Sequence, residues 1–138
     1  MQPKLIMTPL GQYEPVKWNG ENASGCQPFG DRILVLPDGA AEQTTGNVFI
    51  PEGMQERMSM AAESGVLIAM GDTAFTRNFD RTGPWTGKRP EIGQRIGFER
   101  YAGSIRHGKD GRLYRVMDDK CISDYELPTP KKLRAVTD

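Results

Sequence analysis

Glycine and proline interrupt this chain so often that few stretches are long enough for an ordinary helix. The 138 residues contain 16 glycines and 10 prolines. Short apolar runs lie between them, and the clearest are residues 32–36, 65–71 and 95–98. Runs of this length that are rich in β-branched residues and leucine, with turn formers at each end, are typical of strands. Many such strands predict an all-β sandwich or barrel.

A tight hairpin is predicted near the end of the chain. The pair Asp110-Gly111 lies between residues 104–106 and residues 113–117, which both have strand-forming composition. An Asp-Gly pair between two such runs is the usual signal for a hairpin turn. The two runs are therefore expected to pair with each other in antiparallel fashion.

Charge, hydropathy and cysteine content exclude several classes of protein. Eighteen Lys and Arg residues balance 18 Asp and Glu residues, whereas nucleic-acid binders usually carry a basic excess. No apolar run approaches the roughly 18 residues of a membrane span, and the N-terminus lacks the apolar segment of a secretory signal. Cys26 and Cys121 have no partner at metal-ligand or redox spacing. These features predict a cytoplasmic protein with two reduced thiols.

The residues that support enzyme chemistry are scarce. His107 is the only histidine and lies in a stretch of turn formers, so we expect an exposed turn residue. Asp118 and Asp119 are adjacent, and in a strand their side chains would point to opposite faces. We expect them at a solvated turn or strand end. The sequence therefore predicts no catalytic residue, no cofactor, no metal site and no enzyme activity.

The chain divides into a central body with two flanking segments. Residues 1–27 are broken by proline and glycine and predict an extended arm that is partly ordered by docking. The body covers residues 28–126 and contains two long irregular stretches at 40–64 and 72–90. A basic tail occupies residues 127–138. Long loops inside a compact domain are usually functional or disordered.

The stretch 40–64 contains three consecutive large apolar residues. Val48, Phe49 and Ile50 follow a small polar segment, and Gly46-Asn47 and Pro51 bracket them. Such a triplet has two possible burial sites, the core of the protein itself or a groove on a partner. The local residues alone favour the core, because scattered apolar residues need no special explanation.

Residues 52–64 also show a helical pattern. Met54, Met58, Ala61 and Ala62 fall at i, i+4, i+7 and i+8, the spacing of an apolar helix face. Methionines on such a face would make an adaptable binding surface. We favour an irregular returning limb without a stable helix, because isolated helices this short are marginal in water.

The stretch 72–90 mixes basic and aromatic residues. Arginines and lysines outnumber the acidic residues here, and Phe75, Phe79 and Trp85 accompany them. One interpretation is a nucleic-acid-binding surface for single strands, which makes a small nucleic-acid-binding β-barrel the alternative function. The other is an extended hairpin whose aromatic residues pack on its own base. The neutral chain favours the hairpin.

Five motifs follow one another along residues 28–125. They are Pro-Phe-Gly-Asp-Arg with its strand at 28–35, Gly-Asn-Val-Phe-Ile-Pro at 46–51, the glycine-bounded strand at 65–71, Ile-Gly-Gln-Arg-Ile-Gly-Phe at 92–98 and the hairpin at 109–117. In this order the motifs resemble the GroES-type co-chaperonin family. That family opens with Pro-Leu-x-Asp-Arg and carries a Gly-Gly-Ile-Val-Leu-like segment in its mobile loop.

The resemblance implies both a fold and a function. The fold would be a small irregular GroES-like β-barrel with a mobile loop at 40–64 and a roof-type hairpin at 72–90, assembled into a heptameric ring. The protein would cap the nucleotide-bound state of a GroEL-type chaperonin and enclose a substrate protein for folding. The chaperonin-binding residues would be Gly46, Asn47, Val48, Phe49, Ile50 and Pro51.

Several positions depart from the family pattern. Gln94 replaces the usual Asp, and Ser123 and Asp124 stand where the last strand is expected to be apolar. The stretch 72–90 is longer than the usual roof hairpin. Divergence of this kind would suit a bacteriophage-encoded member that acts in the host cytoplasm.

Overall fold

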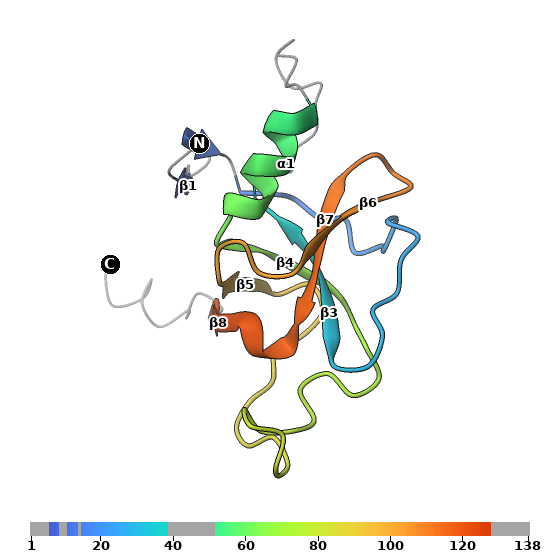
Figure 1. Ribbon diagram of the computed structural model, residues 1–138, viewed down its shortest axis with the longest axis vertical. Helices are drawn as coiled ribbons and strands as arrows, with labels where there is room; N and C mark the ends of the chain where they lie inside the picture. Colours follow the sequence, from blue (N-terminus) through green and yellow to red (C-terminus); the bar gives the residue numbers. More distant parts are fainter. Residues whose placement is uncertain (1–5, 9–10, 14, 39–51, 128–138) are drawn as a thin grey trace, which may run out of the picture.

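The computed structural model describes residues 6–8, 11–13, 15–38 and 52–127 (Figure 1). The strands are β1 Ile6–Thr8, β2 Gly11–Tyr13, β3 Arg32–Pro37, β4 Ser64–Met70, β5 Arg95–Phe98, β6 Ser104–His107, β7 Leu113–Asp118 and β8 Ile122–Tyr125. One α-helix, α1, covers Glu52–Ala61, and a short 3₁₀ helix, η2, covers Asp119–Cys121. Every strand that the sequence predicted is present within one or two residues of its expected bounds.

Six strands form one antiparallel sheet, and β1 pairs separately with β2. The order in the large sheet is β6-β7-β3-β4-β5-β8. Its register shifts between Leu34 and Val35 in β3 and between Gly97 and Phe98 in β5. Bulges of this kind bend a strand and increase its twist, and the sheet curls into the small rounded body seen in Figure 1. The all-β fold class is confirmed.

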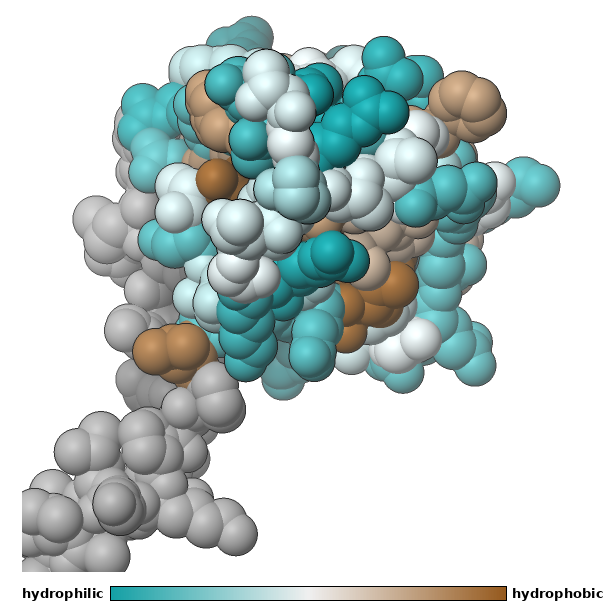
Figure 2. Space-filling model, turned by 90° about the horizontal axis from the view of Figure 1, so that it is seen from below, coloured by the Kyte–Doolittle hydropathy of each residue, from teal (hydrophilic) through white to brown (hydrophobic). Residues whose placement is uncertain are grey.

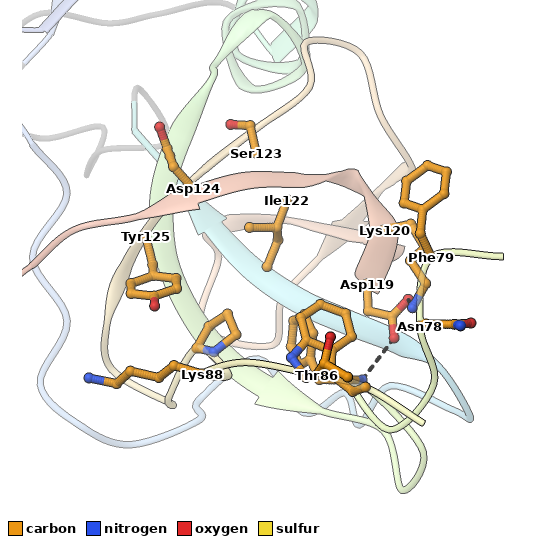
Figure 3. Close-up of a pocket in the computed structure, with 13 residues that line it drawn as sticks. Asn78, Phe79, Thr86, Lys88, Asp119, Lys120, Ile122, Ser123, Asp124 and Tyr125 are labelled. Atoms are coloured by element: carbon orange, nitrogen blue, oxygen red, sulfur yellow. Dashed lines mark hydrogen bonds and ion pairs between the residues drawn. The ribbon is translucent and has the colours of Figure 1, made fainter. Parts of the chain in front are cut away.

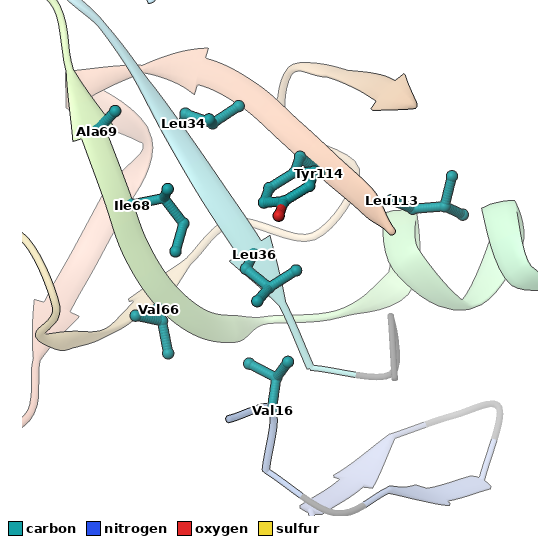
Figure 4. Close-up of a cluster of buried hydrophobic side chains, with 8 residues drawn as sticks. All are labelled: Val16, Leu34, Leu36, Val66, Ile68, Ala69, Leu113 and Tyr114. Atoms are coloured by element: carbon teal, nitrogen blue, oxygen red, sulfur yellow. The ribbon is translucent and has the colours of Figure 1, made fainter. Parts of the chain in front are cut away.

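Strand β3 runs through the centre of the molecule and is buried on both faces. Its side chains alternate, so Leu34 and Leu36 face one core cluster while Ile33 and Val35 face another. The first cluster includes Val16 from the segment before the sheet, which lies beside Leu36 in Figure 4. Residues before the body therefore complete one side of its core.

The preference for an irregular limb at residues 52–64 is wrong, because Glu52–Ala61 forms α1. The helix packs against β6 and β7, and it buries Met58, Ser59 and Ala61. Met58 and Ala61 belong to the helical pattern in the sequence. Packing against the sheet supplies the stability that an isolated helix of ten residues lacks.

Residues 72–90 contain the expected extended hairpin. The backbone of Asn78 donates to Gly83 O at 2.8 Å, and Trp85 N donates to Thr76 O at 3.0 Å. Phe75 and Trp85 pack edge to face at its base, with ring centroids 5.3 Å apart. The third aromatic residue, Phe79, is 79% exposed. The hairpin interpretation thus accounts for two of the three aromatic side chains.

Within the described ranges, Cys26 and Cys121 are both free and partly buried. The same part of the chain has no helix that combines the length and apolar character of a membrane span.

The buried hydroxyl of Tyr114 makes the stability of the core depend on pH. Its side chain is buried, and its hydroxyl donates to Asp110 Oδ2 at 2.5 Å. Burial, and then the bond to Asp110, raise the pKa of this phenol above its ordinary value. The folded state therefore binds the proton more tightly than the unfolded state. The resulting stability is complete below the unfolded pKa of about 10 and is lost as the pH rises beyond it.

We expect Tyr114→Phe to lower the free energy of unfolding at neutral pH by about 1 kcal/mol. The difference from the unchanged protein should narrow above about pH 10, because only tyrosine loses stability there. Urea unfolding across this pH range measures both values. Tyr101→Phe is the matched control, since Tyr101 is exposed. A difference that stays constant across the range would contradict the expected titration.

Candidate functional site

The residues predicted to bind a chaperonin lie outside the described residues. These are Gly46, Asn47, Val48, Phe49, Ile50 and Pro51. The structure does describe the chain up to Asp38 and again from Glu52, which directly follows Pro51. The geometry of the candidate site is therefore the geometry of its two stems.

The first stem is fixed by the buried carboxylate of Asp38, which directly follows β3. Val16 N donates to its Oδ1 at 2.7 Å, and Ser64 Oγ donates to its Oδ2 at 2.5 Å. The backbone N–H of Asp38 also donates to Ser64 O at 2.9 Å. Asp38 thus joins the end of β3 to the start of β4, at the base of the excursion that carries the predicted site.

Arg95 supplies the charge that compensates Asp38. Its Nη2 lies 2.6 Å from Asp38 Oδ2 and its Nη1 lies 3.2 Å from Oδ1, a two-pronged contact. Glu126 Oε2 approaches Arg95 Nε at 3.4 Å on the exposed side. Burial works against the guanidinium charge, but the two carboxylates outweigh it and raise the pKa of Arg95.

The second stem is α1, and its C-terminal end is fixed by Arg115 of β7. Arg115 Nη1 donates to Ser59 O at 3.2 Å and to Ala62 O at 2.9 Å. The N–H of Tyr101 donates to Met60 O at 2.8 Å. The last carbonyls of a helix have no partner within the helix, and a cation there is favoured by the helix dipole.

Arg115 also ties α1 to the connection between β5 and β6. Its Nη2 donates to Glu99 O at 3.1 Å and to Ala102 O at 2.7 Å, and its carbon Cζ lies 4.8 Å from the Phe98 ring centroid. The side chain is fully buried. Burial lowers the pKa of Arg115 to about 10, so the group stays a cation at neutral pH.

The hairpin at 72–90 is joined to the barrel by Arg81. Its guanidinium pairs with Asp31 and donates to both carboxylate oxygens of Asp118, at 2.8 and 2.6 Å. Asp119 Oδ1 lies 3.5 Å from the same group. Arg81 has a backbone φ of 62°, a conformation that this turn imposes and that costs free energy for a residue with a side chain.

Asp118 and Asp119 lie at a strand end followed by a turn, as expected, but the expected solvation is wrong for Asp119, which is buried. Strand β7 ends at Asp118 and η2 begins at Asp119, so the chain turns between them and both carboxylates approach Arg81. Asp119 is buried and accepts a hydrogen bond from Phe75 N at 2.8 Å. Burial raises the pKa of Asp119. The pair is a structural anchor for the hairpin.

A pocket of about 350 Å³ lies between the hairpin and β8 (Figure 3). Ile122 and Tyr125 extend from β8 toward the hairpin. Phe75 and Trp85 also line the pocket. Figure 2 views the molecule from the hairpin end, where the surface is mostly hydrophilic or neutral with a few separate apolar patches. The described residues include no group of three or more His, Cys, Asp or Glu positioned to bind a metal.

The side chain of His107 is exposed, as predicted, but the residue ends strand β6 and does not lie in a turn. Its Nε2 lies 3.4 Å from Glu56 Oε2 on α1, a partner that the sequence did not indicate. Both side chains are about half exposed, so this contact adds little to stability.

The structure weakens the case for a nucleic-acid surface on the hairpin. Arg81 is engaged by carboxylates, and Phe75 and Trp85 face each other at the base. Exposed Arg77, Lys88 and Arg89 remain, together with Phe79. One exposed aromatic residue gives a poor stacking platform for successive bases.

The positions that depart from the predicted family pattern have structural roles. Gln94 Oε1 accepts from Glu91 N at 2.9 Å, and its Nε2 donates to Glu126 O at 3.0 Å. An aspartate in its place would lack the donor. Ser123 and Asp124 are exposed on β8, which is an edge of the large sheet. Polar residues there are compatible with the fold.

Comparison with known proteins identifies the class of this molecule. Residues 25–123 match the family described as the chaperonin 10 Kd subunit. The chain belongs to this family and has a co-chaperonin role, as the ordered motifs predicted. The bacteriophage origin stays a prediction.

The curated relatives carry the same description. Co-chaperonin GroES of Treponema denticola is 31% identical over 78 residues, which cover 56% of this chain and 72% of the relative. Co-chaperonin GroES of Chloroherpeton thalassium is 27% identical over 96 residues, which cover 70% of this chain and 92% of the relative. The 20 kDa chloroplast chaperonin of Arabidopsis thaliana is 29% identical over 94 residues, about a third of its length.

Sequence reasoning missed the residues that fix the two stems. Asp38 stands between Pro37 and Gly39, a context typical of a turn residue, and Arg115 has the position of an ordinary surface charge in a strand. No local pattern distinguishes a buried arginine from an exposed one. Their roles depend on residues more than 20 positions away.

We expect Asp38→Ala to lower the free energy of unfolding by about 3–5 kcal/mol, because Arg95 is left partly buried without its main partner. Glu126→Ala is the matched control on the same arginine. Glu126 is 67% exposed, so this change should cost less than about 1 kcal/mol. Chemical denaturation of both variants measures the difference. If both variants lost the same free energy of unfolding, the buried Asp38–Arg95 pair would contribute no more to stability than the exposed Glu126 contact.

Arg81→Gly tests the hairpin anchor, because glycine tolerates the positive φ while the guanidinium is removed. We expect faster proteolysis within residues 76–86 and loss of stability at neutral pH.

Hydrogen bonding to Thr73 and the Arg81 charge lower the pKa of Asp31, and the pKa of Asp118 is also lowered.

The pH dependence of Arg81→Gly follows from these two carboxylates. A lowered carboxyl pKa contributes stability above the unfolded value of about 4 that is lost as the pH falls through the folded value. The difference between the two proteins should therefore shrink below about pH 4. Arg89→Ala, on the exposed limb, is expected to leave both properties unchanged.

Proposed function

We propose that this co-chaperonin caps the nucleotide-bound state of a GroEL-type chaperonin as a heptameric ring and encloses a substrate protein for folding. The family match over residues 25–123 carries the proposal. The protein would act in the cytoplasm as a binding partner without catalysis.

The arrangement of the stems supports this function. The C-terminal end of β3 and helix α1 lie toward one end of the molecule, and the hairpin 72–90 lies at the opposite end (Figure 1). In a ring of parallel subunits, all copies of residues 46–51 would meet the chaperonin from one rim. The hairpins would then gather at the other rim, where a lid has to close.

The proposed contact consists of the triplet Val48, Phe49 and Ile50. Burying each side chain in a groove contributes about 1.5–3 kcal/mol. Ordering the segment costs roughly 2–5 kcal/mol in return, so a single copy binds weakly. Several copies on one ring raise the overall affinity through effective concentration. Weak individual contacts also allow release when the chaperonin changes state.

Co-sedimentation with a GroEL-type chaperonin, with and without ADP, tests the proposal. We expect nucleotide-dependent binding that Phe49→Asp abolishes, because a carboxylate in an apolar groove is strongly disfavoured. Phe79→Asp is the matched control, since it introduces the same charge at the exposed hairpin residue. That variant should bind like the unchanged protein.

Two results would contradict the proposal. The first is absence of nucleotide-dependent binding by the unchanged protein. The second is equal binding by Phe49→Asp, which would place the contact elsewhere. Oligonucleotide binding with a steep salt dependence, together with the first result, would instead support the nucleic-acid alternative.

A further inference from the structure

Helix α1 starts directly after the segment proposed to bind the chaperonin. Pro51 ends that segment, and Glu52 is the first residue of the helix. Ten helical residues extend about 15 Å, so α1 is a spacer between the barrel and the proposed contact. In Figure 1 the start of α1 points away from the sheet and its end lies against it.

The order of α1 depends on its surroundings. A helix of ten residues is marginal alone. Its C-terminal half has buried side chains, and the barrel provides donors for the carbonyls of Ser59, Met60 and Ala62. Two of these three carbonyls receive their hydrogen bonds from Arg115.

Arginine has the geometry that this position requires. Arg115 makes five hydrogen bonds to the carbonyl oxygens of Ser59, Ala62, Glu99 and Ala102. A planar guanidinium has five N–H donors in a rigid fork, whereas lysine has one ammonium group. Lysine cannot reach the helix and the β5–β6 connection together, and an apolar residue would leave the carbonyls unpaired.

The free-energy cost of burying the Arg115 cation indicates that this residue does more than stabilise the barrel. Every hydrogen bond recorded for Arg115 among the described residues goes to a neutral carbonyl, so no carboxylate compensates the buried charge there. Burying a cation in this way is expensive. The barrel strands are already paired through their own backbones, whereas α1 has no such pairing.

We propose that Arg115 is a positioning residue for chaperonin binding, which acts by fixing α1 to the barrel. The fixed helix holds the chain after Pro51 at a defined place, so less conformational entropy is lost when the preceding segment binds. This inference rests on the proposed function, because it assigns a source of affinity to the same contact.

Arg115→Lys is the first test. We expect rapid hydrogen exchange across residues 52–61 with little change in β3 and β4. Affinity for the chaperonin with ADP should fall at least about tenfold. The ring size in sedimentation velocity should be unchanged. Arg106→Lys, an exposed arginine on neighbouring β6, is the matched control and should change none of these values.

Substitutions at Arg57 distinguish a positioning role of Arg115 from a merely structural role. Arg57 is exposed on α1, and the side-chain hydrogen bonds to Ser59 O and Ala62 O come from Arg115. Alanine favours a helix over glycine by about 1 kcal/mol, which corresponds to roughly a fivefold change. In the Arg115→Lys background, Arg57→Ala should therefore bind about fivefold more tightly than Arg57→Gly. In the unchanged background the two should differ little, because α1 is already ordered.

A third variant covers the case in which Arg115→Lys does not assemble. Arg57→Pro disrupts α1 from its exposed side and leaves Arg115 in place. The same loss of affinity is expected, again with an intact ring.

The outcomes separate the two proposals. Unchanged affinity in a variant whose α1 exchanges rapidly would overturn the role of Arg115 and leave the capping function standing. The role of Arg115 would also be overturned if Arg57→Ala and Arg57→Gly bound equally weakly in the Arg115→Lys background. Absence of nucleotide-dependent binding by the unchanged protein would contradict the capping function and the role of Arg115 with it.

Discussion

The position of α1 on the sheet depends on one interaction, the contact between Arg115 and the C-terminal end of the helix. The sheet can form from backbone pairing and apolar burial, but the helix has to be fixed to it by a donor that reaches several carbonyls. One side chain joins α1, β7 and the β5–β6 connection. As a result, the stem after the predicted binding segment is a defined element of the fold.

Several charged groups among the described residues connect segments that are far apart in the sequence. The chain has equal numbers of positive and negative side chains. Asp38 with Arg95 closes the base of the long excursion, and Arg81 with Asp31 and Asp118 attaches the hairpin. These pairs hold distant parts of the fold together, whereas other basic residues such as Arg77, Lys88 and Arg89 stay exposed.

Strands β3 to β7 could be predicted from the sequence, whereas the β1–β2 pair, the order of strands in the large sheet and the ion pairs between distant residues could not. Runs such as residues 32–36 predict strands through local composition, whereas β1 and β2 lie in the segment that was expected to be an extended arm. The helix was misjudged because its stability comes from β6, β7 and Arg115, which local periodicity does not include. Asp119 was misjudged because its burial depends on a hairpin that starts more than 40 residues earlier. Long-range contacts determine these features, and no window of sequence contains them.

The position of β3 has a consequence for how the chain is made. This strand is apolar on both faces and pairs with β4 on one side and β7 on the other, with Ile33 opposite both Met70 and Met117. During synthesis the N-terminal part emerges first, so β3 leaves the ribosome well before β7 exists. Its second edge stays open until residues 113–118 have also been made. During that interval β3 presents an unpaired apolar edge, which can pair with another chain and aggregate. This co-chaperonin is thus itself exposed to aggregation while it is being made.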